Sequence, residues 1–294
     1  MPQQSQQNKA YWLALLAVLF WSTISSAFKI TLQYVTVDEL VFWSVAWGIV
    51  VLTIINQLGK TPLRFGSLNR NDYLLSALMG FFNPFLYYLV LIKAYDMLEA
   101  QVAGTLNYIW PIVLVLFSIP FLGQKIKTRG LVAIFISFFG IIIISTQGNP
   151  FSLQFSNLTG VLLAVGSAVF WAAYWILNMK DKREDTGKIL MNLIFGLFYL
   201  FIWFLIRGDL PQIPSLKGLL GTLYIGVFEM SITFVIWLKA LNYSKDTAKV
   251  SNLIYLSPFM GLFWISQTVG ETIHWYVAAG LVFIVGGILI QSKK

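Results

Sequence analysis

The chain has 294 residues, of which 58% are hydrophobic and 11% are charged, and its formal net charge is +8. Soluble domains are typically about 45–50% apolar and about 25% charged, so this chain has too little polar surface to cover a globule in water. Its basic residues lie in short gaps between apolar runs, which excludes the basic surface of a nucleic-acid-binding protein. Cysteine is absent and His274 is the one histidine, so we expect no disulfide, metal or cofactor.

Ten apolar stretches are each long enough to cross about 30 Å of hydrocarbon. They predict an all-α integral membrane protein with ten transmembrane helices. A turn at 94–98 divides the third from the fourth, because Asp96 and Glu99 interrupt the apolar run. The first stretch could be a signal peptide, but its sequence recurs later in the chain, so we expect it to be retained. The predicted spans are 10–29, 38–58, 72–93, 99–121, 130–147, 157–179, 187–206, 217–239, 246–268 and 273–291.

The distribution of basic residues predicts the orientation of the chain. Cytoplasmic loops of membrane proteins carry an excess of lysine and arginine. With ten spans, all but four of the 20 lysines and arginines fall on one side of the membrane, and the exceptions are Lys29, Lys93, Arg207 and Lys217. Both termini are therefore expected in the cytoplasm, in a multi-pass protein of the inner or plasma membrane.

The second half of the sequence repeats the first. The segment FFNPFLYYLVLIKA at 81–94 aligns without a gap with VFEMSITFVIWLKA at 227–240, and NYIWP at 107–111 aligns with IYLSP at 254–258. Because each half has an odd number of spans, the second half enters the membrane from the opposite side. We expect two inverted five-helix repeats, residues 1–150 and 151–294, around a central cavity. Many secondary transporters are built in this way, so the repeat favours a carrier.

Near the end of the fourth span, LNYIWPI at 106–112 is followed by FLGQKI at 121–126. These motifs, in ten spans arranged as two inverted halves, resemble the EamA family of the drug/metabolite transporter superfamily. The similarity covers residues from about 10 to 291, and the LNYIWP stretch is most similar to the YddG-type aromatic amino acid exporters. The resemblance implies that spans 1, 3, 4, 6, 8 and 9 surround the cavity, with spans 5 and 10 at the periphery.

Proline interrupts three of the apolar spans. Proline inside a helix removes a backbone hydrogen bond and clashes with the preceding turn, at a cost of about 3 kcal/mol. Broken helices are tolerated in a membrane where they line a cavity. We therefore interpret Pro84, Pro111 and Pro258 as kinks that expose backbone to a substrate and serve as hinges. A static kink that fits its neighbours is the alternative.

Glu229 lies near the middle of the eighth span. Burial disfavours the charged form of a carboxyl group, so a glutamate at this depth can exchange a proton. We consider it a candidate for proton coupling or for pairing with a substrate ammonium group. The alternative is a structural carboxyl group that is hydrogen-bonded between helices. Its repeat equivalent is Asn83, which does not titrate.

Polar and aromatic side chains gather in spans 1, 3, 4, 6, 8 and 9. Trp21 and Trp171 occupy matching positions at mid-membrane depth, below the interface where tryptophan usually concentrates. Such rings can stack on a substrate ring or attract an ammonium group, although many must serve packing in a chain with 16% aromatic residues. The residues expected to line the substrate path are Trp21, Asn83, Tyr87, Asn107, Trp110, Trp171, Tyr174, Glu229 and Tyr255.

The sequence predicts a secondary active or facilitative transporter of small organic metabolites that works by alternating access. The family resemblance favours an exporter of aromatic and neutral amino acids, and the alternative is a carrier or importer of choline-like organic cations. A membrane scaffold or sensor gives no reason for an inverted repeat. The sequence holds no catalytic constellation and no phosphate-binding loop, so we expect neither an enzyme nor an ATP-driven pump. The expected partners are a small-molecule substrate and the lipid bilayer, with the protein a monomer or homodimer.

Overall fold

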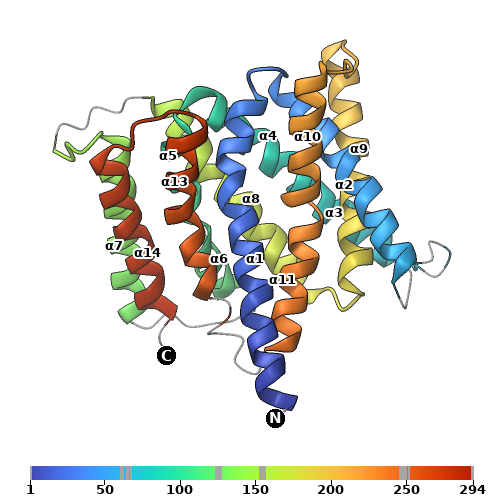
Figure 1. The fold of residues 1–294 in the computed structure, drawn as a ribbon, viewed down its shortest axis with the longest axis horizontal. Coiled ribbons are helices and arrows are strands. Elements are labelled where there is room, and N and C mark those ends of the chain that lie inside the picture. Colours follow the sequence, from blue (N-terminus) through green and yellow to red (C-terminus); the bar gives the residue numbers. More distant parts are fainter. Residues whose placement is uncertain are drawn as a thin grey trace.

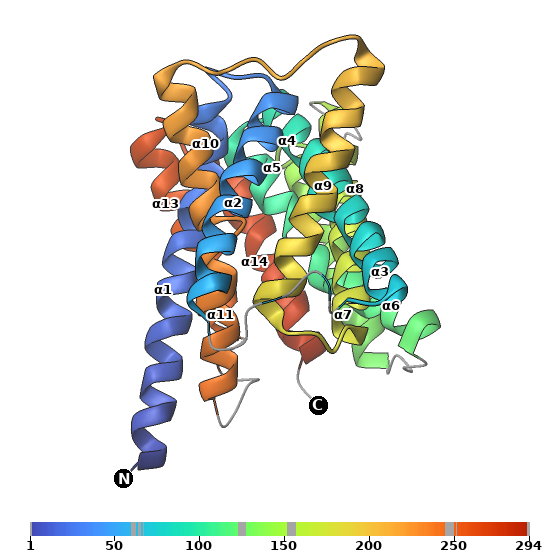
Figure 2. The same ribbon diagram turned by 90° about the vertical axis from the view of Figure 1, so that its right-hand side faces the viewer.

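Apolar helices account for nearly all of the chain, and they run side by side in one bundle (Figure 1). The computed structural model describes residues 2–59, 63, 66, 68–122, 128–151, 157–244, 250 and 252–292. No β-strand occurs within these ranges. The first and last described helices begin and end, respectively, at one end of the bundle, which we call the terminal end, and we call the opposite one the distal end (Figure 2). The protein is thus an all-α membrane protein.

The helices of the two halves correspond in order. The first half contains α1 (Pro2–Thr31), α2 (Val37–Leu58), α3 (Arg70–Gly80), a π-helical segment (Phe81–Leu86), α4 (Tyr87–Met97), α5 (Ala100–Asn107), α6 (Trp110–Leu122) and α7 (Thr128–Ser145). The second half contains α8 (Leu158–Lys180), α9 (Asp185–Arg207), α10 (Leu216–Phe228), α11 (Ile232–Tyr243), a 3₁₀ segment (Asn252–Leu256), α13 (Ser257–Thr268) and α14 (Trp275–Ser292).

These helices follow the predicted spans closely. Within the described ranges, eight helical segments are long and apolar enough to cross a bilayer, and they coincide with the first eight predicted spans. The last two predicted spans correspond to shorter apolar helices, so the count of ten stays a prediction. The predicted turn between the third and fourth spans falls at Leu98 and Glu99. Part of the FLGQKI stretch, the start of the ninth predicted span and several basic loop residues lie outside the described residues, and the orientation stays a prediction.

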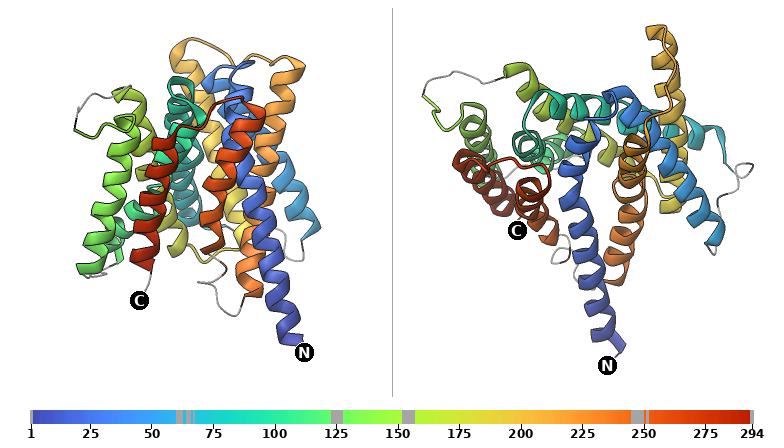
Figure 3. Two further views of the ribbon diagram at one scale, coloured as in Figure 1. Left: turned by 60° about the vertical axis from the view of Figure 1, so that its left-hand side comes forward. Right: turned by 45° about the horizontal axis from the view of Figure 1, so that its top comes forward.

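Equivalent helices of the two halves make equivalent contacts: each packs against the corresponding elements of the opposite half. α1 packs against α11 and α13, while α8, its repeat equivalent, packs against α4 and α6. Likewise α2 contacts α10 and α9 contacts α3, and α2 and α9 also contact each other. α7 and α14 pack together at one edge of the bundle (Figure 3), which is the peripheral position that the family resemblance implies for spans 5 and 10. The division at residue 150 stays a prediction.

The equivalent helices α1 and α8 run in opposite directions. Near the end of α1, Lys29 donates from Nζ to the carbonyl oxygens of Tyr95 and Leu98, at 2.8 and 2.7 Å. Just before the start of α8, Asn157 donates from Nδ2 to the carbonyl oxygen of Met97, at 3.3 Å. The end of α1 and the beginning of α8 therefore both meet the last turn of α4 at the distal end, as two inverted repeats require.

Each half contains interrupted spans at corresponding positions. In the third span, Asn83 has non-helical φ and ψ angles of −148° and 116° inside the π-helical segment. In the eighth, α10 ends at Phe228 and α11 begins at Ile232, so Glu229 lies in the break. Asn83 and Glu229 are the residues that the repeat aligns. The fourth span breaks after Asn107, and the ninth changes from 3₁₀ to α-helix at Ser257.

Two of the three prolines singled out from the sequence follow a break. Pro111 is the second residue of α6, and Pro258 is the second residue of α13. A backbone N–H has no intrahelical partner in the first turn of a helix, so proline is tolerated there. These two prolines therefore start helices after a break, whereas Pro84 lies inside the π-helical segment. The role of all three positions as hinges stays a prediction.

The inverted topology can be tested with single cysteines in a chain that has none of its own. Arg70, at the start of α3, and Asp209, after α9, are exposed at equivalent places in the two repeats. We expect a membrane-impermeant maleimide to label Arg70→Cys and Asp209→Cys from opposite faces of the membrane. Labelling of both variants from one face would contradict the inversion.

The close contact between α7 and α14 predicts a stability effect. A Cβ atom at Gly140 would lie 2.6 Å from the carbonyl oxygen of Gly280, which forces the two backbones apart. Overpacking of this kind typically costs about 1–3 kcal/mol. Gly140→Ala should therefore unfold at a lower temperature than the parent in detergent. Gly286→Ala on α14 is the control, because no atom lies within 4 Å of its new Cβ, and equal losses in both variants would refute the explanation.

Candidate substrate cavity

A cavity of about 340 Å³ lies in the middle of the bundle. Its lining residues come from α1, α4, α5, α6, α8, α11, the 3₁₀ segment, the start of α13, and the breaks at 108–109 and 229–231. These elements belong to spans 1, 3, 4, 6, 8 and 9, the six that the family resemblance implies. Ligand pockets commonly have volumes of about 300–1,000 Å³, so the cavity has room for a small metabolite.

The structure brings most of the predicted path residues into this cavity. Seven line it, namely Trp21, Tyr87, Asn107, Trp110, Trp171, Glu229 and Tyr255. The other two, Asn83 and Tyr174, line a smaller chamber next to it. Although Asn83 and Tyr87 are four residues apart, the non-helical backbone at Asn83 keeps them from sharing one helical face. Contact of any of these residues with a substrate stays a prediction.

Several lining residues were not singled out from the sequence. Phe234, Trp237, Leu238 and Leu241 form one face of α11, at the i, i+3, i+4 and i+7 spacing of a helix. That spacing is visible in the sequence and could have identified the face once α11 was oriented. Ser25 and Tyr95 also line the cavity, and their hydroxyl groups are hydrogen-bonded to each other at 2.6 Å. A lone serine and a tyrosine at a helix end gave no comparable signal.

Aromatic rings form the walls of the cavity. Trp171 stacks on Tyr87 with 4.6 Å between ring centroids, and it meets Trp110 edge to face at 6.4 Å. Elsewhere in the lining, the ring of Trp21 lies 5.5 Å from that of Trp237. Such walls favour a flat ring, which can stack, or an ammonium group, which the ring faces attract.

Glu229 supplies the carboxyl group of the cavity. Its side chain is 9% exposed, and Oε1 accepts a hydrogen bond of 2.8 Å from the hydroxyl group of Tyr88 on α4. The break that carries Glu229 leaves carbonyl groups without helical partners. The hydroxyl group of Ser231 donates to the carbonyl oxygen of Gly226, and that of Thr233 donates to the carbonyl oxygen of Phe228. The break is thus satisfied within the protein, as the membrane interior requires.

Asn107 connects three helices at the end of α5. Its Oδ1 accepts a hydrogen bond of 3.2 Å from Tyr87 on α4, and its Nδ2 donates one of 2.8 Å to Ser167 on α8. Both ends of the amide are therefore engaged. Tyr108, the next residue, donates from its hydroxyl group to the carbonyl oxygen of Ile254 at 2.9 Å. This bond ties the break in the fourth span to the equivalent region of the ninth.

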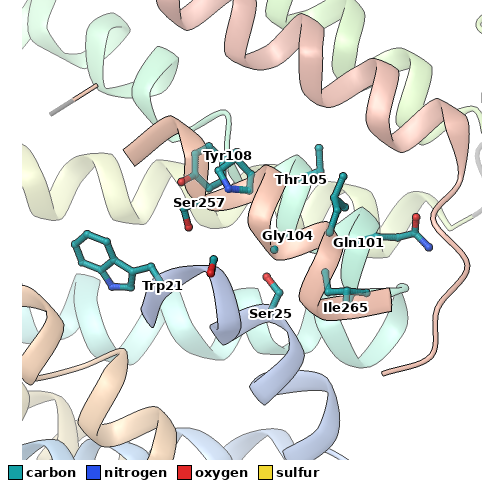
Figure 4. Close-up of a pocket in the computed structure, with 13 residues that line it drawn as sticks. Trp21, Ser25, Gln101, Gly104, Thr105, Tyr108, Ser257 and Ile265 are labelled. Carbon is teal, nitrogen blue, oxygen red and sulfur yellow. The ribbon is translucent and has the colours of Figure 1, made fainter. Parts of the chain in front are cut away.

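The two ends of the cavity differ. Toward the terminal end, its lining continues along α11 to Leu241. Toward the distal end lies a polar pocket of about 50 Å³ between α1, α5 and α13, which shares Trp21, Ser25 and Tyr108 with the cavity (Figure 4). Gln101 and Ile265 line the outer part of this pocket.

Hydrogen bonds link the two halves at the distal end, beyond this pocket. Glu271, after α13, accepts from the backbone N–H groups of Ala100 and Gln101 at 2.7 and 3.1 Å. The Gln101 side chain donates to the carbonyl oxygen of Thr272 and accepts from the backbone N–H of His274, both at 2.9 Å. We call these bonds the distal latch. They fasten the loop before α14 to the first turn of α5.

Two inverted helical halves around a central cavity define a polytopic membrane transport protein. The chain belongs to the EamA-like transporter family, whose model matches residues 8–146 and 158–292. An uncharacterized transporter of Clostridium kluyveri is 26% identical over 98% of this chain and 94% of its own length. The aromatic amino acid exporter YddG of Escherichia coli is 21% identical over 97% of each chain. A solved crystal structure with a TM-score of 0.68 covers 96% of both chains at 17% identity and shows a shared fold.

The distal latch predicts how access to the cavity is controlled. Hydrogen bonds to a charged group contribute about 1.5–3 kcal/mol each, so Glu271→Ala should favour a state that is open at the distal end. We expect a cysteine in place of Ser22, which lines the polar pocket, to react about tenfold faster with an impermeant maleimide applied from the distal face. Asp96→Ala, which removes an exposed pair with Lys93, should leave the rate unchanged. Equal rates in all three backgrounds would refute this role of the latch.

Proposed function

We propose that this protein is a secondary carrier that exports aromatic and large neutral amino acids by alternating access. The observation that carries the proposal is the central cavity, which combines aromatic walls with a single carboxyl group at a break in a helix. A ring-bearing side chain would stack on Trp171 and Tyr87. The amino group would be attracted by the ring faces and by Glu229, and each cation–π contact is worth about 0.5–2 kcal/mol.

The distal latch and the symmetric packing support alternating access. The latch holds the distal end closed, while the cavity lining extends toward the terminal end. In a pair of inverted repeats, each half can adopt the arrangement of the other, which exchanges the open and closed ends. If the terminal end faces the cytoplasm, as the loop charges predict, the described state would load a substrate for export. The name of the Escherichia coli relative supports this direction.

We assign proton coupling to Glu229, which would link transport of the substrate to movement of a proton. A buried carboxyl group binds a proton more readily than one in water, because burial disfavours its charged form. Protonation would neutralise the cavity, and substrate binding would then favour one protonation state over the other. The sequence has no phosphate-binding loop, so an ion gradient or the substrate's own gradient supplies the energy.

A carrier of organic cations is the second candidate, because the same observations also suit it. Aromatic walls beside a carboxylate are a favourable site for a quaternary ammonium group. In such a carrier the charge of Glu229 would hold the substrate itself, whereas in a proton-coupled amino acid carrier the zwitterionic substrate would depend on it less. Neutralising Glu229 therefore separates the two functions.

The test uses purified protein in liposomes and the panel phenylalanine, threonine and choline. We expect the parent to exchange labelled phenylalanine and to accumulate it when a pH gradient is imposed. Glu229→Gln should keep phenylalanine exchange within about threefold and lose the response to the gradient, since the amide binds no proton. The control Asp209→Asn, in an exposed loop, should behave as the parent.

Three outcomes would contradict the proposal in different ways. Transport of choline but not of amino acids, abolished by Glu229→Gln, would identify the cation carrier. Movement of none of these solutes, with transport of an unrelated metabolite, would refute the substrate class. A full response of Glu229→Gln to the pH gradient would refute proton coupling through this residue.

A further inference from the structure

A small polar chamber lies beside the substrate cavity, between the third span, α8, α9 and α11. Asn83, Tyr88, Tyr174 and Asn192 line it together with four apolar side chains, and its volume is about 10 Å³. A buried space needs about 10–15 Å³ to hold one water molecule. The chamber is therefore too small for the substrate and large enough for about one water.

The oxygen atoms of two buried amide groups in this chamber lack a hydrogen-bond partner. Asn83 is 6% exposed and Asn192 is 1% exposed, and Oδ1 of each has no partner within the structure. Leaving a buried polar atom unpaired costs about 1–3 kcal/mol. A water molecule both donates and accepts hydrogen bonds, so it satisfies an amide in either orientation, whereas Na⁺ needs several oxygen ligands. The chamber thus fits a water better than a metal cation.

Tyr88 connects the chamber to the substrate cavity. Its side chain lines the chamber, and its hydroxyl group donates to Oε1 of Glu229 at 2.8 Å. The titratable groups that interact with Glu229 from the packed helices are Tyr87, Tyr88 and Tyr95 of α4 and Tyr108 after α5. Of these, Tyr88 is the one that both lines the chamber and bonds to the carboxyl group.

We propose that the chamber holds a water molecule between Asn83 and Asn192, and that Glu229 exchanges its proton through this water and Tyr88. The inference rests on the proposed proton coupling of Glu229. During uptake, a hydronium ion from solvent gives a proton to the chamber water, the water gives one to the hydroxyl oxygen of Tyr88, and Tyr88 donates its own to Oε1 of Glu229. The water and the tyrosine each release one proton as they accept another, the carboxylate gains one, and release follows the same steps in reverse.

Polar side chains continue from the chamber toward the terminal end. The hydroxyl group of Tyr174 accepts a hydrogen bond of 3.2 Å from Asn178, one turn further along α8. α8 ends at Lys180, and the following loop carries the exposed Lys182. In the proposed path, solvent water from the loop at 181–184 reaches the chamber along Tyr174 and Asn178 and supplies the proton, because an amide N–H does not pass one on.

The loop at the end of this path is fastened, so a substrate does not pass there. Arg183 pairs with Asp181 at 2.6 Å and donates to Ser76 of α3 at 2.8 Å. Burial opposes ionisation of Asp181, but hydrogen bonds and charge from Arg183 outweigh it and lower the pKa of the carboxyl group, so it stays ionised at neutral pH. In the proposed path, water supplies the protons while this corner stays fastened, so protons move separately from the substrate in the cavity.

The experiment compares coupling with exchange in three variants. Tyr88→Phe removes the hydroxyl group, and Asn83→Leu fills the chamber with an apolar side chain. In liposomes, both should lose accumulation driven by a pH gradient about tenfold while exchange of labelled phenylalanine, which needs no net proton movement, stays within about twofold. Tyr224→Phe is the matched control, because the hydroxyl group of Tyr224 bonds to Thr23 and the side chain lines neither the chamber nor the substrate cavity, and it should keep both activities.

The outcomes separate this inference from the proposed function. If Glu229→Gln loses the response to the gradient while Tyr88→Phe and Asn83→Leu keep it, the proton reaches Glu229 by another route and only the chamber proposal falls. If Glu229→Gln keeps the response, both proposals fall. Loss of exchange in proportion to accumulation would assign the chamber a structural role. If transport requires Na⁺ and Asn83→Leu removes that requirement, the chamber is a cation site and the proposal of a bound water is wrong.

Discussion

The fold depends on one constraint, which is that hydrocarbon offers no partner to a backbone N–H or C=O group. A span can therefore break only where other parts of the protein supply hydrogen bonds. At the break beside Glu229, the hydroxyl groups of Ser231 and Thr233 bond to the carbonyl oxygens of the last turn of α10. At the 3₁₀ segment, Tyr108 reaches Ile254. The breaks face the centre of the bundle, and the cavity lies where they meet.

The inverted arrangement places this constraint on both halves at once. Because α1 packs on α11 and α13 in the way that α8 packs on α4 and α6, each break is supported by a helix of the other half. The alternating access proposed above would therefore shift both breaks together. The distal latch joins Gln101 of the first half to the Glu271–His274 loop of the second, so its hydrogen bonds lie at the boundary between the two halves.

The sequence predicted the architecture more completely than the details of the site. Span positions follow from hydropathy, which depends on composition over about 20 residues and tolerates local irregularity. The positions of Asn83 and Tyr174 depend on single-residue geometry. The π-helical segment rotates Asn83 away from the face of Tyr87, and Trp171 stacks on Tyr174 and separates it from the cavity. A helix start and a kink at Pro111 could not be distinguished from the sequence, because proline is compatible with both. In the structure the break precedes Pro111, and α6 begins at Trp110.

Asn83 and Glu229, which the repeat aligns, differ in whether they can titrate. Two carboxyl groups at equivalent, closely spaced breaks would repel each other when charged, and one would then stay protonated. An asparagine at the first position avoids that repulsion and still offers polar atoms to the chamber. Since only one of the two positions can titrate, this pair of breaks carries at most one proton in a cycle. In the proposed carrier, the duplication would supply the alternating geometry, and the difference between Asn83 and Glu229 would limit this pair of breaks to one proton.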